Sequence, residues 1–166
     1  MSDTKPAATA GDLGDAELRR IYPGLRRFAA AVAPKEIDPD DLMQEAFERL
    51  LAHGTSDVVH VEAYVRQIIV HAASNHRRQL GRLRRALGRL SLLTSATDAE
   101  ADYPSNLAFL EHIAPTARAV LFLQEVEGLQ IRAIAHQLGM SEAAVKQTAS
   151  RARHDLREHI EQETSE

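Results

Sequence analysis

IRAIAHQLGMSEAAVKQTASRAR, residues 131–153, has the pattern of a helix-turn-helix. Ala135 is small where a second helix would cross the first closely, and Gly139 supplies the positive φ that the turn needs. Ser141 is placed to cap the second helix, and Val145 is placed to pack back onto the first. A plain helical hairpin is the alternative. The basic character of the second helix favours the DNA-binding motif.

The same register predicts which side chains of the second helix point outward. In a helix-turn-helix, outward residues of this helix meet base edges and phosphates in the major groove. The residues expected on that face are Glu142, Ala143, Lys146, Gln147, Ser150 and Arg151.

Apolar residues at helical spacing predict further helices along the chain. The expected segments are residues 13–32, with a possible interruption at Pro23, then 39–54, 61–80, 107–112, 115–127, 130–138 and 141–160. No strand pattern is present. We therefore expect an all-α protein of two small helical domains joined by a flexible linker, the second containing the helix-turn-helix. The expected division is a tail at 1–12, a first domain at 13–88, a linker at 89–105 and a second domain at 106–166.

The expected helix at 39–54 has the clearest start. Asp38 is a suitable N-cap, Pro39 suits the first helical position, and Asp40 and Asp41 complement the helix dipole. Gly54 suits the end of this helix as a left-handed cap. Its apolar residues are expected to point inward, namely Leu42, Ala46, Phe47, Leu50 and Leu51.

The composition narrows the class of protein. Aromatic residues are only 4% of the 166, so the core must be mostly aliphatic, which favours helix-on-helix packing. No cysteine is present, which excludes disulfides and thiolate zinc sites. Apolar runs fall short of the roughly 18 residues of a membrane span, and the N-terminus lacks a secretory core, so we expect no membrane insertion and a cytoplasmic location.

Charge is distributed in blocks along the chain. A net charge of −4 by itself argues against a nucleic-acid-binding protein, but the charged residues are unevenly distributed along the chain. Residues 36–57 and 98–127 are acidic, whereas residues 71–90 and 132–157 are rich in arginine. This pattern indicates two surfaces for a polyanion and at least one for a basic partner. Amphipathic helices with solvated arginine faces are the alternative interpretation.

Residues 115–158 resemble the region-4 domain of bacterial RNA polymerase sigma factors. DPDDLMQEAFERLL (38–51) and VEAYVRQIIVHAASNHRR (61–78) resemble the region-2 domain. Two such domains without an intervening region 3 resemble the extracytoplasmic function (ECF) group. The resemblance implies a subunit that binds core RNA polymerase, recognises the −10 and −35 promoter elements and promotes promoter opening.

The resemblance also implies roles for individual residues. Those matching the segment that docks on the β′ clamp coiled coil are Asp41, Gln44, Glu45 and Glu48, although a dipole-complementing first turn and a solvated face would also suit acidic residues here. The residues that match the family's reader of the −10 element are Tyr64, His71, Ser74, Asn75, Arg77 and Arg78. The loop at residues 55–60 matches the family's pocket for an extruded base. Arg82, Arg84 and Arg85 would contact DNA phosphates together with Arg77 and Arg78. Those matching the −35 reader are Arg132, Glu142, Lys146, Gln147, Ser150, Arg151 and Arg153.

Two positions depart from the family pattern, because Val70 replaces a common arginine and His71 the usual asparagine. Tyr64 is either a core residue or a DNA contact. An anti-sigma protein is expected by resemblance alone.

Two other classes of protein remain for comparison. A conventional helix-turn-helix regulator with a dimerisation or sensing domain would explain residues 131–153 but not 38–51. An enzyme is not expected, because the histidine pairs 71/76 and 154/159 are five residues apart and no HExxH or phosphate-binding glycine loop is present. We expect no catalytic residue, metal or cofactor.

Overall fold

The computed structural model describes residues 15–54, 58–91 and 111–164, and every regular element in these ranges is helical. The all-α prediction is confirmed over this part of the chain. The expected tail, most of the expected linker and most of the expected helix at 107–112 lie outside the described residues.

The first half of the chain forms a three-helix unit of α1 (Asp15–Val32), α2 (Pro39–His53) and α3 (Val61–Ser91). Asp38 caps α2 as expected, accepting a hydrogen bond from the Asp40 amide at 2.8 Å. Pro23 lies inside α1 without ending it, so the possible interruption there is absent. Gly54 has φ 86° and ψ 143°, so it uses a positive φ but not the left-handed helical conformation expected of it.

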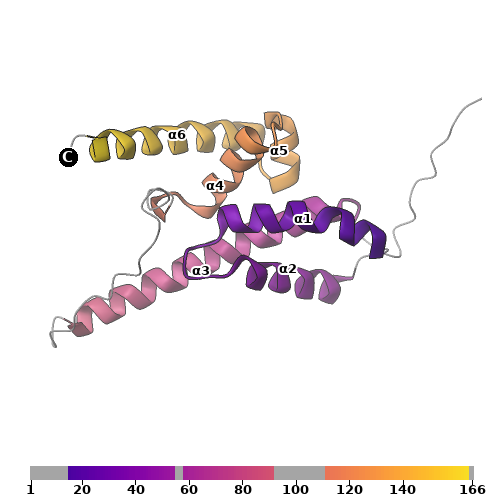
Figure 1. Ribbon diagram of the computed structural model, residues 1–166, viewed down its shortest axis with the longest axis horizontal. Coiled ribbons are helices and arrows are strands. Elements are labelled where there is room, and N and C mark those ends of the chain that lie inside the picture. The colour runs from indigo at the N-terminus through magenta and orange to yellow at the C-terminus, as the bar shows by residue number, and fades with distance from the viewer. Residues whose placement is uncertain (1–14, 55–57, 92–110, 165–166) are drawn as a thin grey trace, which may run out of the picture.

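Helix α3 runs through to Ser91 rather than ending near Leu80, and so enters the segment expected to be linker. Good helix formers, mainly leucine and arginine, fill this extension. Gly81 and Gly88, which led us to expect an end, are tolerated within it. Figure 1 shows the end of α3 projecting beyond the other helices, and Leu83 and Leu87 there are exposed.

The second half consists of α4 (Pro115–Leu121), η2 (Phe122–Val126), α5 (Ile131–Leu138) and α6 (Glu142–Thr164). The helix expected at 115–127 changes at Phe122 from α to a π-helical turn. The helix-turn-helix forms as expected between α5 and α6. Gly139 adopts φ 63° in the turn, and Ser141 Oγ accepts from the Ala144 amide at 3.1 Å.

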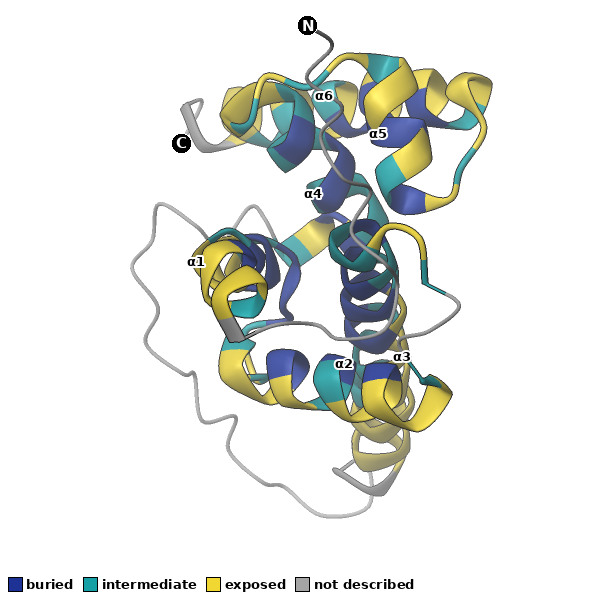
Figure 2. Cartoon of the chain, turned by 90° about the vertical axis from the view of Figure 1, so that its right-hand side faces the viewer, coloured by how far each residue is buried: buried dark blue, intermediate teal, exposed yellow. Residues whose placement is uncertain are grey.

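The two units pack against each other around a continuous apolar core. The rings of Phe28 in α1 and Phe122 in η2 meet edge to face with centroids 5.9 Å apart. Arg118 of α4 donates to the Ala33 carbonyl at 2.9 Å, which ties α4 to the end of α1. Figure 2 shows buried residues where α1, α3 and α4 meet and exposed ones on the outer faces. Nothing in the sequence pattern had predicted this contact between the units.

Candidate polymerase and nucleic-acid interfaces

One face of α2 is polar and open to solvent. Asp41, Gln44 and Glu48 are spaced by three and four residues, so they lie on one side of the helix, and all three are exposed. Gln44 Nε2 donates to Glu48 Oε1 at 2.9 Å. The face therefore presents carboxylates beside an amide, a combination that suits a basic, hydrogen-bonding partner.

Glu45 differs from its neighbours. It is partly buried, and its carboxylate lies 3.0 Å from Nε2 of His76 in α3 while pairing with Arg49. Glu45 thus holds α2 against α3 as well as bordering the polar face.

Leu51 continues the same face of α2. Its side chain is 73% exposed, so the expectation that it points inward is wrong. Leu50, which is 2% exposed, occupies the inward position instead. Successive helical residues are about 100° apart, and here the step from Leu50 to Leu51 carries the second side chain out of the core. An exposed leucine at the end of a polar face is a candidate contact residue that the sequence pattern did not reveal.

A pocket of about 260 Å³ opens between α2, α3 and α5. The Tyr64 ring lies against that of His53, with centroids 5.4 Å apart and an interplanar angle of 30°. Tyr64 is half-buried against the core and also lines the pocket. The lining residues are His53, Val58, Val59, His60, Ala63, Tyr64, Gln67 and His136. Of the expected pocket loop at 55–60, residues 55–57 lie outside the described residues.

Beyond the pocket, the −10 candidates follow the outer side of α3. His71, Asn75 and Arg78 are exposed and Ser74 is half-buried. Arg78 donates to Asn75 Oδ1, so these two side chains are joined. Val70, where the family often has arginine, is 5% exposed and belongs to the core.

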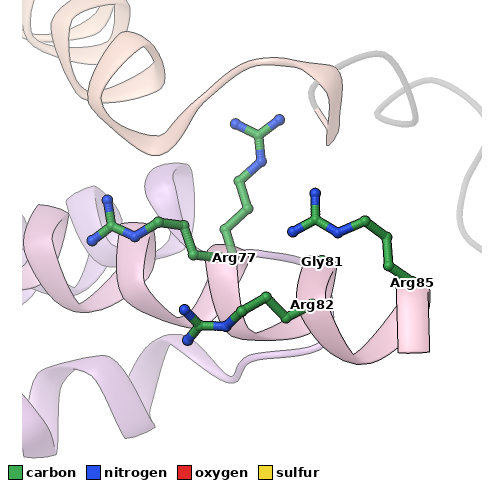
Figure 3. Close-up of a pocket in the computed structure, with 5 residues that line it drawn as sticks. Arg77, Gly81, Arg82 and Arg85 are labelled. Carbon is green, nitrogen blue, oxygen red and sulfur yellow. The ribbon is translucent and has the colours of Figure 1, made fainter. Parts of the chain in front are cut away.

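A hollow of about 360 Å³ lies along α3 among arginines. Figure 3 shows Arg77, Arg82 and Arg85 on successive turns around Gly81, and Arg78 completes the lining. None of its lining side chains among the described residues is acidic. Several guanidinium groups around one concave surface can bind a chain of phosphates.

Two arginines expected on phosphates are engaged within the protein. Arg77 donates to the Glu111 and His112 carbonyls at 3.4 and 3.2 Å, which ties α3 to the segment before α4. Arg84 pairs with Glu36. Among the described residues no carboxylate pairs with Arg78, Arg82 or Arg85, and the carbonyl contacts of Arg77 leave its charge unneutralised, so these four arginines supply the charge of the surface.

The outer face of α6 carries the residues predicted for the −35 element. The residues exposed there are Glu142, Lys146, Gln147, Ser150 and Arg151, with Arg132 exposed on α5. Val145 is fully buried with Ile134 and Leu138 in the same apolar cluster, which gives the predicted register. Arg153 instead pairs with Glu125 at 2.7 Å, so it joins α6 to η2.

Within the described residues, no three histidine or carboxylate side chains gather as a metal site would require. None of the described helices is both long and apolar enough to cross a bilayer.

Comparison with known proteins gives two family matches in the order of the two units. Residues 18–83 match the family model for Sigma-70 region 2, and residues 107–156 match the one for Sigma-70, region 4. No curated protein matches the chain. Among solved structures, the chain is similar to the sigma factor RpoE from Bartonella quintana, in complex with the anti-sigma factor NepR. The identity is 21% and the TM-score 0.54, over 88% of this chain and 95% of that one, so this likeness bears on the fold.

Proposed function

Because the chain belongs to the sigma-70 family, in the extracytoplasmic function group of sigma factors, we propose that it binds core RNA polymerase, recognises the −10 and −35 promoter elements and promotes opening of the duplex. Sigma factors are transcription initiation factors and not a family of enzymes. The observation that supports the proposal is that one chain carries both an exposed polar face on α2 and a helix-turn-helix whose outer α6 face is exposed.

The α2 face is the proposed contact with the polymerase, at the β′ clamp coiled coil. Asp41, Gln44 and Glu48 would pair with basic side chains, and the exposed Leu51 would bury apolar surface beside them. The conventional helix-turn-helix regulator accounts for residues 131–153 but not for the α2 segment that carries this face. This is why we favour the sigma factor over a regulator with a dimerisation or sensing domain.

The pocket beside Tyr64 is the proposed site for an unpaired base of the −10 element. The α2 and α3 side of this pocket offers the rings of Tyr64 and His53 as stacking surfaces for one base. Stacking on an aromatic ring contributes about 1–3 kcal/mol per base, which offsets part of the cost of separating the strands. The strand would then follow His71, Ser74, Asn75 and Arg78 along α3, with phosphates on the arginine-lined hollow.

The α6 face is the proposed reader of the −35 element. Lys146, Gln147, Ser150 and Arg151 offer donors to base edges and phosphates, with Arg132 at the flanking backbone. Arg153 would contact DNA only by exchanging its pairing with Glu125.

An anti-sigma protein is a further proposed partner, supported by the anti-sigma complex of the similar structure. We propose a cytoplasmic location, since the template and the polymerase are found there.

Run-off transcription with core polymerase on a library of upstream fragments tests the proposal. We expect initiation at defined sites only when the chain is added. A conventional regulator would bind operator duplex on its own and would not direct core enzyme to initiate.

A further inference from the structure

The end of α3 that projects beyond the other helices (Figure 1) has two different sides. Leu83 and Leu87 are 55% and 53% exposed there. At about 100° per residue these two leucines lie about 40° apart around the helix, so they form one apolar stripe. Arg85 lies on the opposite side of the helix from both leucines, and Arg89 lies opposite Leu87. One side of this end is therefore apolar and the other is cationic.

The charge of this end has a single sign. Residues 77–91 contain six arginines and no acidic residue, and the nearest acidic residues in the sequence are Glu62 and Asp98. Among the described residues, the only acidic side chain that forms an ion pair with this segment is that of Glu36, at Arg84. Because one carboxylate cannot neutralise six guanidinium groups, the end of α3 keeps a large positive charge.

The proposed contact with DNA phosphates accounts for the arginines of this end but not for its leucines. Phosphates bound in the hollow that Arg78, Arg82 and Arg85 line would lie on the arginine side of the helix. Leu83 and Leu87 would then stay in water. A basic helix with an exposed apolar stripe is typical of a segment that binds a membrane surface or a partner helix.

An anionic lipid surface can meet both sides of this helix at once. A helix that lies in a membrane interface buries its apolar side at the boundary between headgroups and acyl chains, while its arginines reach the surrounding headgroups. Arg82 and Arg84 lie about 100° to either side of Leu83, where such headgroups would be. A protein partner would need carboxylates on several sides of one helix, whereas a layer of anionic lipid supplies negative charge all along it.

We propose that the end of α3, residues 77–91, binds the surface of an anionic membrane. Leu83 and Leu87 enter the outer part of the acyl layer, and the arginines bind lipid phosphates. This binding is peripheral and crosses no bilayer. It goes beyond the proposed function and does not depend on it. Because lipid and DNA would both use Arg82 and Arg85, a chain held on a membrane in this way cannot place these arginines on DNA.

Tryptophan emission tests whether the leucine stripe enters lipid. The chain contains no tryptophan, so Leu87→Trp gives a single reporter on the stripe. Ile160→Trp on α6, at a position 52% exposed, is the matched control. On adding vesicles of phosphatidylcholine and phosphatidylglycerol, we expect the emission of Leu87→Trp to move to shorter wavelength and to be quenched by brominated lipid. The emission of Ile160→Trp should stay unchanged.

Two results of this measurement would overturn the proposal. If the emission of Leu87→Trp does not move on anionic vesicles, the stripe serves another occupant, such as an acidic protein. If its emission is already at short wavelength without vesicles, the chain itself covers the stripe.

Vesicle flotation separates the role of the leucines from that of the charge. Leu83→Ser with Leu87→Ser should weaken binding to the anionic vesicles about fivefold and leave the affinity for duplex DNA within twofold of the parent. Val126→Ser with Ile160→Ser, at exposed positions in the second half of the chain, is the control and should bind vesicles as the parent does. Melting temperatures establish that both variants are folded. Vesicle binding unchanged by the leucine substitutions would show that the chain recognises phosphates from any source, which contradicts the proposal.

A second pair of variants tests the charge. Arg82→Gln with Arg85→Gln should weaken binding to the anionic vesicles about fivefold. Arg27→Gln with Arg157→Gln removes the same charge at exposed positions on α1 and α6 and should have little effect. Equal losses in the two variants, or equally tight binding to vesicles of phosphatidylcholine alone, would show that this end does not recognise anionic lipid. No polymerase or promoter is present, so such a failure is distinct from failure of the transcription assay.

Discussion

The carboxylate of Glu45 in α2 lies 3.0 Å from Nε2 of His76 in α3, and the same carboxylate pairs with Arg49. An acidic residue proposed for the polymerase-binding face is therefore also part of the packing between two helices. Its neighbours Asp41 and Glu48 make no such contact with α3 and are exposed. The two kinds of acidic residue on α2 should respond differently to substitution.

Glu48→Lys should weaken binding to core polymerase about tenfold, or about 1.4 kcal/mol, without lowering the melting temperature. The reason is that an exposed charge facing a basic partner changes sign, while the hydrogen bond from Gln44 that is lost is exposed to solvent and contributes little to stability. Titration of labelled chain with core enzyme at low and high salt measures the affinity. Glu17→Lys, an exposed reversal on α1, is the control and should bind normally.

Glu45→Lys should impair core binding and also lower the melting temperature, since it opposes His76 and Arg49. Unchanged affinity in both α2 variants would rule out this face as the docking surface.

Lys146→Ala combined with Arg151→Ala should weaken promoter selection about tenfold while core binding stays intact. Both side chains are exposed on α6 and neither contributes to the core. Loss of one phosphate contact lowers the salt slope of duplex binding by about 0.9. Promoter competition assays at several salt concentrations measure both effects, with Arg157→Ala further along α6 as control. Loss of core binding in the double variant would contradict the division of roles between the units.

Tyr64→Ala should reduce promoter opening, since stacking contributes about 1–3 kcal/mol per base. Tyr64→Phe keeps the ring and should behave as the parent. Permanganate reactivity of thymines around the start site reports the open region. Because Tyr64 also stacks on His53, the melting temperature of each variant must be compared. Equal opening by the alanine and phenylalanine variants would show that the pocket holds no base.

A pH-dependent contribution to stability is expected from Asp40. A hydrogen bond from Arg26, with Nε to Oδ1 at 2.7 Å, lowers the pKa of this carboxyl below its ordinary value of 3.8. A group whose pKa is lower in the folded state stabilises the fold above the ordinary value and stops doing so as the pH falls through the lowered pKa. Asp40→Asn should therefore melt slightly below the parent at neutral pH and converge with it in strong acid.

A double-variant comparison isolates this pair. Arg26→Gln should have the same effect as Asp40→Asn, and combining them should add little. Additive losses would mean that the two residues act separately.

Local signals in the sequence predicted the helix boundaries well where a cap decides them. Asp38, Ser141 and Gly139 act on their own turn of the chain, so their role can be recognised without knowing the fold. The end of α3 was missed because Gly81 and Gly88 weaken a helix by only about 1 kcal/mol each, and the arginines and leucines around them favour it. Leu51 was misplaced because both adjacent leucines were assigned to the inward face, and hydropathy alone does not tell which of them lies at the edge of the buried side.

The sequence by itself determined the helical class, the helix-turn-helix and the family, because spacing, caps and motif order are properties of neighbouring residues. The tertiary structure alone decided that Glu45 supports packing, that Tyr64 lines a pocket and that Arg66 meets Glu127. Glu45 and His76 are 31 positions apart in the sequence, and Arg66 and Glu127 are 61 apart. The pocket beside Tyr64 has His136 of α5 in one wall. Such pairings depend on how amphipathic helices bury their apolar faces against one another. Many arrangements of the same helices are compatible with one pattern of apolar residues, so the sequence pattern does not select among them.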